Sequence, residues 1–97
     1  MTYRLHRGAE RDLLEAEKFY RREGGAKLAS RFLDEFERVA ALMVEFPGIG
    51  TPADDLRRVH PMQDFPYSVI YREIGGEIRI LVIRAHFRDP EHGDGRR

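Results

Sequence analysis

Residues 65–88, FPYSVIYREIGGEIRILVIRAHFR, decide the fold that the rest of the chain must accommodate. The segment Phe65–Ile74 is rich in Tyr, Val and Ile, residues that favour a pleated, half-buried strand. Gly75-Gly76 is a two-residue loop that tolerates positive φ at both positions, and a second apolar run follows at Glu77–Ala85. The stretch therefore predicts a β-hairpin.

The two glycines also predict the register of this hairpin, because a loop of known length fixes which residues face each other. The expected cross-strand pairs are Tyr71 with Ile80, Val69 with Val82, Tyr67 with Arg84, and Phe65 with His86. The run Ile78–Ile83 is apolar on both faces, which favours a central strand. Side chains alternate along a strand, so Arg84, His86 and Arg88 share one face if the strand extends that far.

Two amphipathic helices are predicted before the hairpin. Ala9–Glu23 has apolar residues at helical spacing, and Gly24-Gly25 ends it. Ala26–Phe46 has an apolar residue at every third or fourth position, namely Leu28, Phe32, Phe36, Val39, Met43 and Phe46. A break of two residues between such helices predicts an antiparallel helical hairpin.

The remaining segments complete a prediction of an α+β fold. Tyr3–Leu5 and Leu56–His60 are short candidate strands, 47–55 is a Gly/Pro/Asp loop, and the polar tail Asp89–Arg97 is expected to be mobile. The order is then β-α-α-β-β-β, with the helical hairpin on one face of a mostly antiparallel sheet. A chain of 97 residues is expected to form one domain, 1–97, whose second sheet face is only partly covered.

Composition excludes several classes of function. The chain has no Cys, so it has no disulfide framework and no thiol nucleophile. The 17 basic and 17 acidic residues balance, so no overall field attracts nucleic acid, although most of the basic residues are Arg. The charged start does not resemble a signal peptide, and no apolar run is long enough to span a membrane. A cytoplasmic protein is the expectation.

The most promising chemistry lies at the end of the hairpin. His86 can transfer protons near neutral pH, and the neighbouring Arg84 and Arg88 can hold a phosphate and its developing charge. Such a set suits the cleavage of RNA. The alternative is that these are strand-end groups bonded to backbone or to the acidic residues that follow.

Other polar clusters are weaker candidates. Arg57-Arg58 either extends a basic rim or pairs with Asp54 and Asp55. The histidines lack a metal-ligand spacing, so no metal or other cofactor is expected. The acidic residues of the first helix are expected to form a solvated face rather than a catalytic pair; they are Glu10, Asp12, Glu15 and Glu17.

These motifs, taken together, resemble the RelE/ParE superfamily of bacterial toxin–antitoxin toxins, and its ParE branch in particular. The resemblance covers nearly the whole chain. Its parts are Ala9, Asp12, Leu13 and the Phe19-Tyr20 pair, then Arg31–Leu33, Phe46–Gly50, Arg57–Val59, Phe65–Arg72 and Ala85–Pro90. The order and spacing of these parts are specific, whereas each part alone is not.

The superfamily contains two activities. RelE-like members cut mRNA on the ribosome, and ParE-like members inhibit DNA gyrase. Cleaving members carry Arg where this chain has Ser68 and, in some cases, a catalytic Tyr where it has Phe87. ParE-like members often carry an aromatic pair where this chain has His92 and Gly93. The ribonuclease site is therefore predicted to be incomplete.

The resemblance implies a ParE-like toxin that inhibits DNA gyrase by binding, without enzymatic activity, and that a ParD-like antitoxin neutralises in a hetero-oligomer. The expected target-binding residues are Arg57, Arg58, Arg84, His86 and Arg88. The expected antitoxin-binding residues are Leu14, Leu28, Phe32 and Phe36. Two alternatives remain: a RelE-like endonuclease with His86 and Arg88 as catalytic residues, and an inactive relic that only binds its antitoxin.

Overall fold

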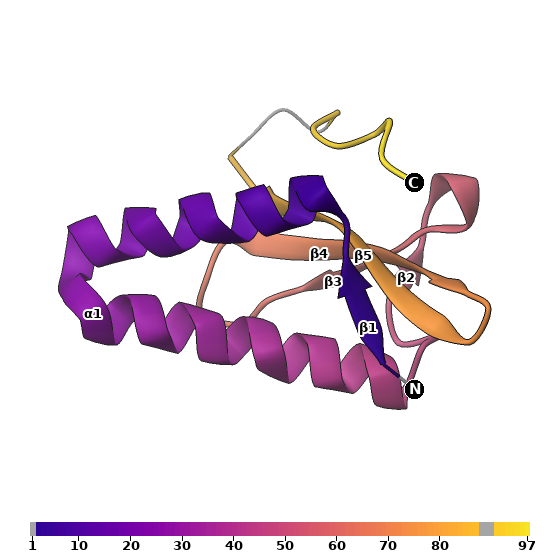
Figure 1. Ribbon diagram of the computed structural model, residues 1–97, viewed down its shortest axis with the longest axis horizontal. Helices are drawn as coiled ribbons and strands as arrows, with labels where there is room; N and C mark the ends of the chain where they lie inside the picture. The colour runs from indigo at the N-terminus through magenta and orange to yellow at the C-terminus, as the bar shows by residue number, and fades with distance from the viewer. Residues whose placement is uncertain (1, 88–90) are drawn as a thin grey trace.

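A computed structural model describes residues 2–87 and 91–97 of the chain, and Figure 1 shows its two layers. One layer is α1 (Arg7–Glu45). The other is a sheet of β1 (Tyr3–Leu5), β2 (Thr51–Pro52), β3 (Arg58–Pro61), β4 (Tyr67–Ile74) and β5 (Glu77–Ala85). A 3₁₀ turn, η1 (Asp54–Leu56), lies between β2 and β3. The α+β class predicted from the sequence is confirmed.

The helical segment runs on through Gly24, and only Gly25 leaves helical geometry, with φ 81° and ψ −174°. Figure 1 shows the chain turning back at this end of α1. We call residues 7–24 the first arm and 26–45 the second arm. The arms meet through aromatic side chains, with the rings of Tyr20 and Phe32 5.2 Å apart. Glycine suits this turn because an L side chain rarely adopts such a positive φ.

The sheet is mixed, in the order β1-β5-β4-β3-β2. β1 runs parallel to β5, and the other pairs are antiparallel. The central position of β5 agrees with its apolar sequence. β2 was not predicted, and the strand expected at Leu56–His60 begins later, at Arg58, because Leu56 belongs to η1.

The hairpin register is correct near the glycines and wrong beyond them. Tyr71 faces Ile80 as predicted, but Ile70 faces Val82, so Leu81 is an extra residue that forms a β-bulge. The pairs expected for Val69 and beyond are therefore shifted by one residue. The partner of Val69 is Ile83, that of Ser68 is Arg84, and that of Tyr67 is Ala85.

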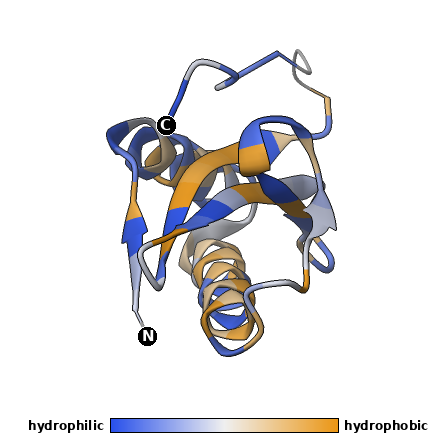
Figure 2. Cartoon of the chain, turned by 90° about the vertical axis from the view of Figure 1, so that its right-hand side faces the viewer, coloured by the Kyte–Doolittle hydropathy of each residue, from blue (hydrophilic) through white to orange (hydrophobic). Residues whose placement is uncertain are grey.

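The bulge divides the apolar residues of β5 between the two faces of the sheet. Ile78, Ile80 and Ile83 face the arms of α1, where the main core also contains Phe32, Phe36, Val39, Met43, Val69 and Tyr71. Leu81 and Val82 lie together on the other face, in a small cluster with Ile70. Figure 2 shows the second arm end-on below the sheet and the C-terminal segment above it.

The polar side chains of Tyr71 and His6 fix the ends of this layer structure. The Tyr71 hydroxyl donates to the Pro47 carbonyl at 2.8 Å and accepts the Gly50 N–H at 2.9 Å, which holds the loop after the second arm against the sheet. His6 caps α1, because its Nδ1 accepts the Gly8 N–H at 2.9 Å. No helix of the described residues is long and apolar enough to cross a membrane.

The His6 cap makes stability dependent on pH. Burial, with the charges of Arg79, Arg96 and Arg7, lowers the pKa of His6 below its ordinary value of 6.5. The unfolded chain therefore binds the proton first as pH falls, and the cap is lost on protonation of Nδ1. The contribution of His6 to stability should be fully present well above pH 6.5 and should be lost progressively as the pH falls below it. Urea unfolding of the wild type and of His6→Ser at pH 7.5 and 5.5 checks this.

The serine caps at every pH, so His6→Ser should lose less stability between these two pH values than the wild type. Equal losses in the two proteins would contradict a role for His6 protonation.

Candidate functional site

Ser68, Arg84 and His86 meet at the rim where the β4–β5 hairpin ends. Ser68 faces Arg84 across the two strands, and its Oγ lies 2.8 Å from Nε2 of His86. The His86 side chain is exposed, and its backbone N–H bonds to the Pro66 carbonyl at 2.8 Å. The prediction that Arg84 and His86 lie together is consistent with this geometry, whereas Arg88 lies outside the described residues.

The arginines expected to line a basic rim bond to the backbone instead. Arg57 is 8% exposed, and its guanidinium donates to the carbonyls of Asp94 and Arg96, both at 2.5 Å. Arg58 donates to the carbonyl of Gly50 at 2.8 Å and to that of Gly48 at 3.3 Å. This geometry does not favour Arg57 as a target-binding residue, because its guanidinium is buried and already bonded to carbonyls of the fold itself.

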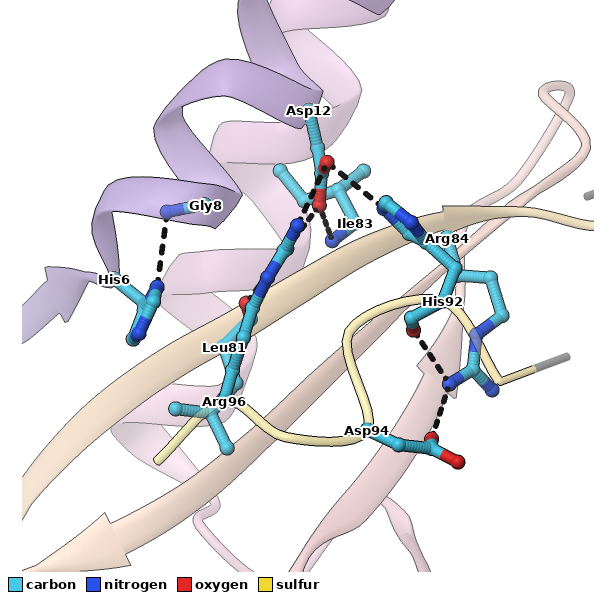
Figure 3. Close-up of polar contacts among 9 residues, drawn as sticks. All are labelled: His6, Gly8, Asp12, Leu81, Ile83, Arg84, His92, Asp94 and Arg96. Atoms are coloured by element: carbon cyan, nitrogen blue, oxygen red, sulfur yellow. Dashed lines mark hydrogen bonds and ion pairs between the residues drawn. The ribbon is translucent and has the colours of Figure 1, made fainter. Parts of the chain in front are cut away.

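Arg84 is also committed within the chain. Its Nη2 donates to the His92 carbonyl at 3.0 Å and lies 3.3 Å from an Asp94 carboxylate oxygen. Figure 3 shows this guanidinium reaching the C-terminal segment. A cation held in this way has less positive charge to offer to a phosphate from outside.

Asp12 is the centre of the polar network in Figure 3. Its carboxylate accepts the Ile83 N–H at 3.1 Å and the Arg96 Nη1 at 2.6 Å. The His92 Nε2 lies 3.0 Å from its other oxygen. Asp12 is only 8% exposed. The expectation that it belongs to a solvated helix face is wrong, because it faces the sheet from the first arm.

The sequence contained a signal for this position. Asp12 lies three residues after Ala9 and four before Ala16, and both alanines are buried. Helical spacing thus placed the carboxylate in the apolar stripe. A carboxylate buried on such a stripe needs donors, and Ile83, just past the bulge, provides a backbone N–H.

The segment 91–97, which the sequence predicted as part of a mobile tail, packs against the sheet. A Cβ on Gly93, where φ is 81°, would lie 2.4 Å from Val82 Cγ2. A Cβ on Gly8 would lie 2.3 Å from Nε of Arg96. Both glycines therefore make room for close approach, and the segment covers part of the second sheet face.

An apolar cleft of about 360 Å³ lies where the first arm meets the end of the hairpin, and Asp12 and His92 also contribute to its walls. Its walls include Phe19 and Lys18 from the arm and Tyr67, Ala85 and Phe87 from the end of the hairpin. Phe19 is 38% exposed and Phe87 72% exposed. Water-exposed aromatic surface of this kind is typical of a protein contact.

The predicted antitoxin-binding residues divide into two groups. Leu14 is 54% exposed, and Leu28 is half-buried. Phe32 and Phe36 are buried in the core, and the interpretation of these two as docking anchors is wrong. Exposing a buried Phe would cost about 2–3 kcal/mol, so the fold holds them inside.

The described residues contain no group of three or more His, Cys, Asp or Glu side chains arranged to hold a metal ion.

Comparison with known proteins identifies relatives of this fold. The family model described as "ParE toxin of type II toxin-antitoxin system, parDE" matches residues 3–90. A solved chain from the "Chromosomal ParDE TA system from P. aeruginosa" matches with a TM-score of 0.77 and 25% sequence identity, over 88% of this chain and 95% of that chain. No curated protein sequence matches significantly.

Replacing Asp12 should be costly. Asp12→Ala removes the carboxylate and leaves Arg96 and the Ile83 N–H without their acceptor, which should lower the free energy of unfolding by about 3 kcal/mol. Glu37→Ala, at an exposed position of the second arm, is the control and should change it by less than about 0.5 kcal/mol. Urea unfolding at pH 7.5 measures both, and equal losses would refute the network.

The docking of the C-terminal segment has its own test. Gly93→Ala introduces a Cβ that clashes with Val82 at a positive φ, and should destabilise the protein by about 1–2 kcal/mol. Gly95→Ala is the matched control, since its Cβ would meet open space. If the two variants unfold at the same urea concentration, segment 91–97 does not pack as described.

Proposed function

The chain belongs to the ParE family, the toxins of type II toxin–antitoxin systems, and from this premise we propose that it inhibits DNA gyrase by binding rather than by cutting RNA. The observation that carries the proposal is that the arginines of the rim are bonded within the chain. Among the residues that the structure describes, Arg57, Arg58 and Arg84 all bond to carbonyl oxygens of the chain itself, so these three cations are already held.

Phosphodiester cleavage needs a cation or a donor aimed at the charge that develops on phosphate. Loss of one such group costs roughly a hundredfold or more in rate. Ser68 stands at the place where cleaving relatives carry Arg, and it bonds to Nε2 of His86. A histidine bonded to serine and a set of committed arginines are a weak ribonuclease site, and this favours a mechanism based on contact.

A cognate antitoxin would neutralise the toxin in a hetero-oligomer. We assign its docking surface to Leu14 and to the apolar cleft with Phe19 and Phe87. An amphipathic helix laid along the first arm could bury these side chains, with Leu28 at the edge of the contact. The site of action is the cytoplasm, where gyrase acts on the chromosome.

Induction of the chain in a bacterial host tests the proposal. We expect DNA-damage signalling and filamentation with intact mRNA, and toxicity should tolerate His86→Ala better than removal of the tail from Asp89 onward. The two readouts are a damage-responsive reporter and primer extension on abundant transcripts in the same cells.

Two results would contradict the proposal. Prompt mRNA cleavage that His86→Ala abolishes would assign an endonuclease with His86 and Arg88 as catalytic residues. A wild type that leaves growth unchanged, while its antitoxin still binds, would assign an inactive relic.

A further inference from the structure

The turn η1 holds two consecutive non-glycine residues in the left-handed region. Asp55 has φ 59° and Leu56 has φ 62°. Asp tolerates this conformation because its short side chain can bond locally, but a leucine there is an outlier. The fold therefore maintains a strained leucine next to β3.

Burial of the Leu56 side chain does not offset this backbone strain. Its side chain is 81% exposed, more than any other large apolar residue among those described. The turn is instead held from its two sides, by the Arg57 N–H on the Asp54 carbonyl at 3.2 Å and the Ala53 N–H on the Arg57 carbonyl at 2.8 Å. An exposed side chain on a fixed, strained backbone is typical of a functional contact.

We propose that Leu56, with the carboxylates of Asp54 and Asp55, forms the contact by which this toxin engages the protein that it inhibits. The inference rests on the proposed function and adds the recognition surface to it. The partner is expected to offer an apolar socket for Leu56, rimmed by cationic side chains. All three residues of the turn are exposed.

The charge of the turn selects a protein over nucleic acid. Two adjacent carboxylates repel phosphate, so the turn is unsuited to a nucleic-acid backbone. Strand addition is also disfavoured beside it, because Pro52 in the edge strand β2 has no N–H to donate. Recognition must then occur through side chains, and Leu56 is the apolar one.

This turn and the apolar cleft are separate surfaces. A second hollow of about 340 Å³ lies beside the turn and includes Asp54, Asp55, Arg57 and Arg84 among its walls. It shares no residue with the cleft beside the first arm. With the cleft assigned to the antitoxin, the turn remains for a second partner.

Leu56→Asn tests the inference, because asparagine accepts a left-handed φ and removes the apolar side chain. Ile74→Asn is the matched control. Ile74 is an isoleucine of the same size as leucine, is 45% exposed and lies next to the hairpin loop. Each variant and the wild type are compared by melting temperature, by growth arrest on induction, and by inhibition of supercoiling with purified DNA gyrase.

We expect Leu56→Asn to melt at the wild-type temperature or higher, because strain is relieved, and to lose at least tenfold in toxicity, which is about 1.4 kcal/mol of binding. Ile74→Asn should keep its toxicity. A stable Leu56→Asn protein that arrests growth as the wild type does would overturn the inference. A Leu56→Asn protein that remains toxic but is no longer neutralised by the antitoxin would also overturn it.

The outcome for gyrase separates this inference from the proposed function. If the wild type arrests growth without inhibiting gyrase, the proposed target is wrong, and growth arrest by Leu56→Asn still decides the role of the turn. A wild type without any toxicity overturns both.

Discussion

The fold depends on one buried carboxylate. Asp12 lies on the apolar side of the first arm and accepts donors from β5 and from the C-terminal segment, at Ile83 and Arg96. An ionised carboxylate removed from water without partners costs several kcal/mol, so these donors must be in place together. The first arm is thereby fixed to β5 and to the C-terminal segment, both of which are far from it in sequence.

This constraint explains why the arginines of the rim are bonded within the chain. The bulge at Leu81 shifts the end of β5 by one residue and sets Arg84 opposite Ser68. The docked C-terminal segment then supplies carbonyl oxygens to Arg57 and Arg84. The same contacts that stabilise the sheet's second face thus occupy the guanidinium groups. A surface built in this way suits recognition of a partner better than phosphate chemistry.

The sequence predicted the parts of the fold that have a local signal. The Gly75-Gly76 turn, the apolar β5 and the stripe of the second arm each follow from spacing, and the break near Gly25 follows from glycine chemistry. The bulge has no such signal, since Leu81, Val82 and Ile83 are all apolar and no polar residue marks the change of face. Alternation cannot register an extra residue in a strand that is apolar on both sides.

The candidate site was harder to predict for a related reason. Its cations are bound by backbone carbonyls, and every residue has a carbonyl, so composition does not reveal which ones Arg57 will meet. Asp12 was not distinguished from the other acidic residues of the first arm, although its spacing from Ala9 placed it on the buried face of the helix. The positive φ of Leu56 could not be predicted, because no residue type in the turn indicates it.

Amide hydrogen exchange at Ile83 tests most directly the claim that Asp12 ties the first arm to the bulged strand. If the carboxylate holds this N–H, Ile83 should exchange as slowly as the core amides of β5, through global unfolding. In Asp12→Ala, the protection of Ile83 should fall more than that of Val69 on β4. An Ile83 amide that exchanges in the wild type as fast as those of the exposed Gly75-Gly76 loop would contradict the account.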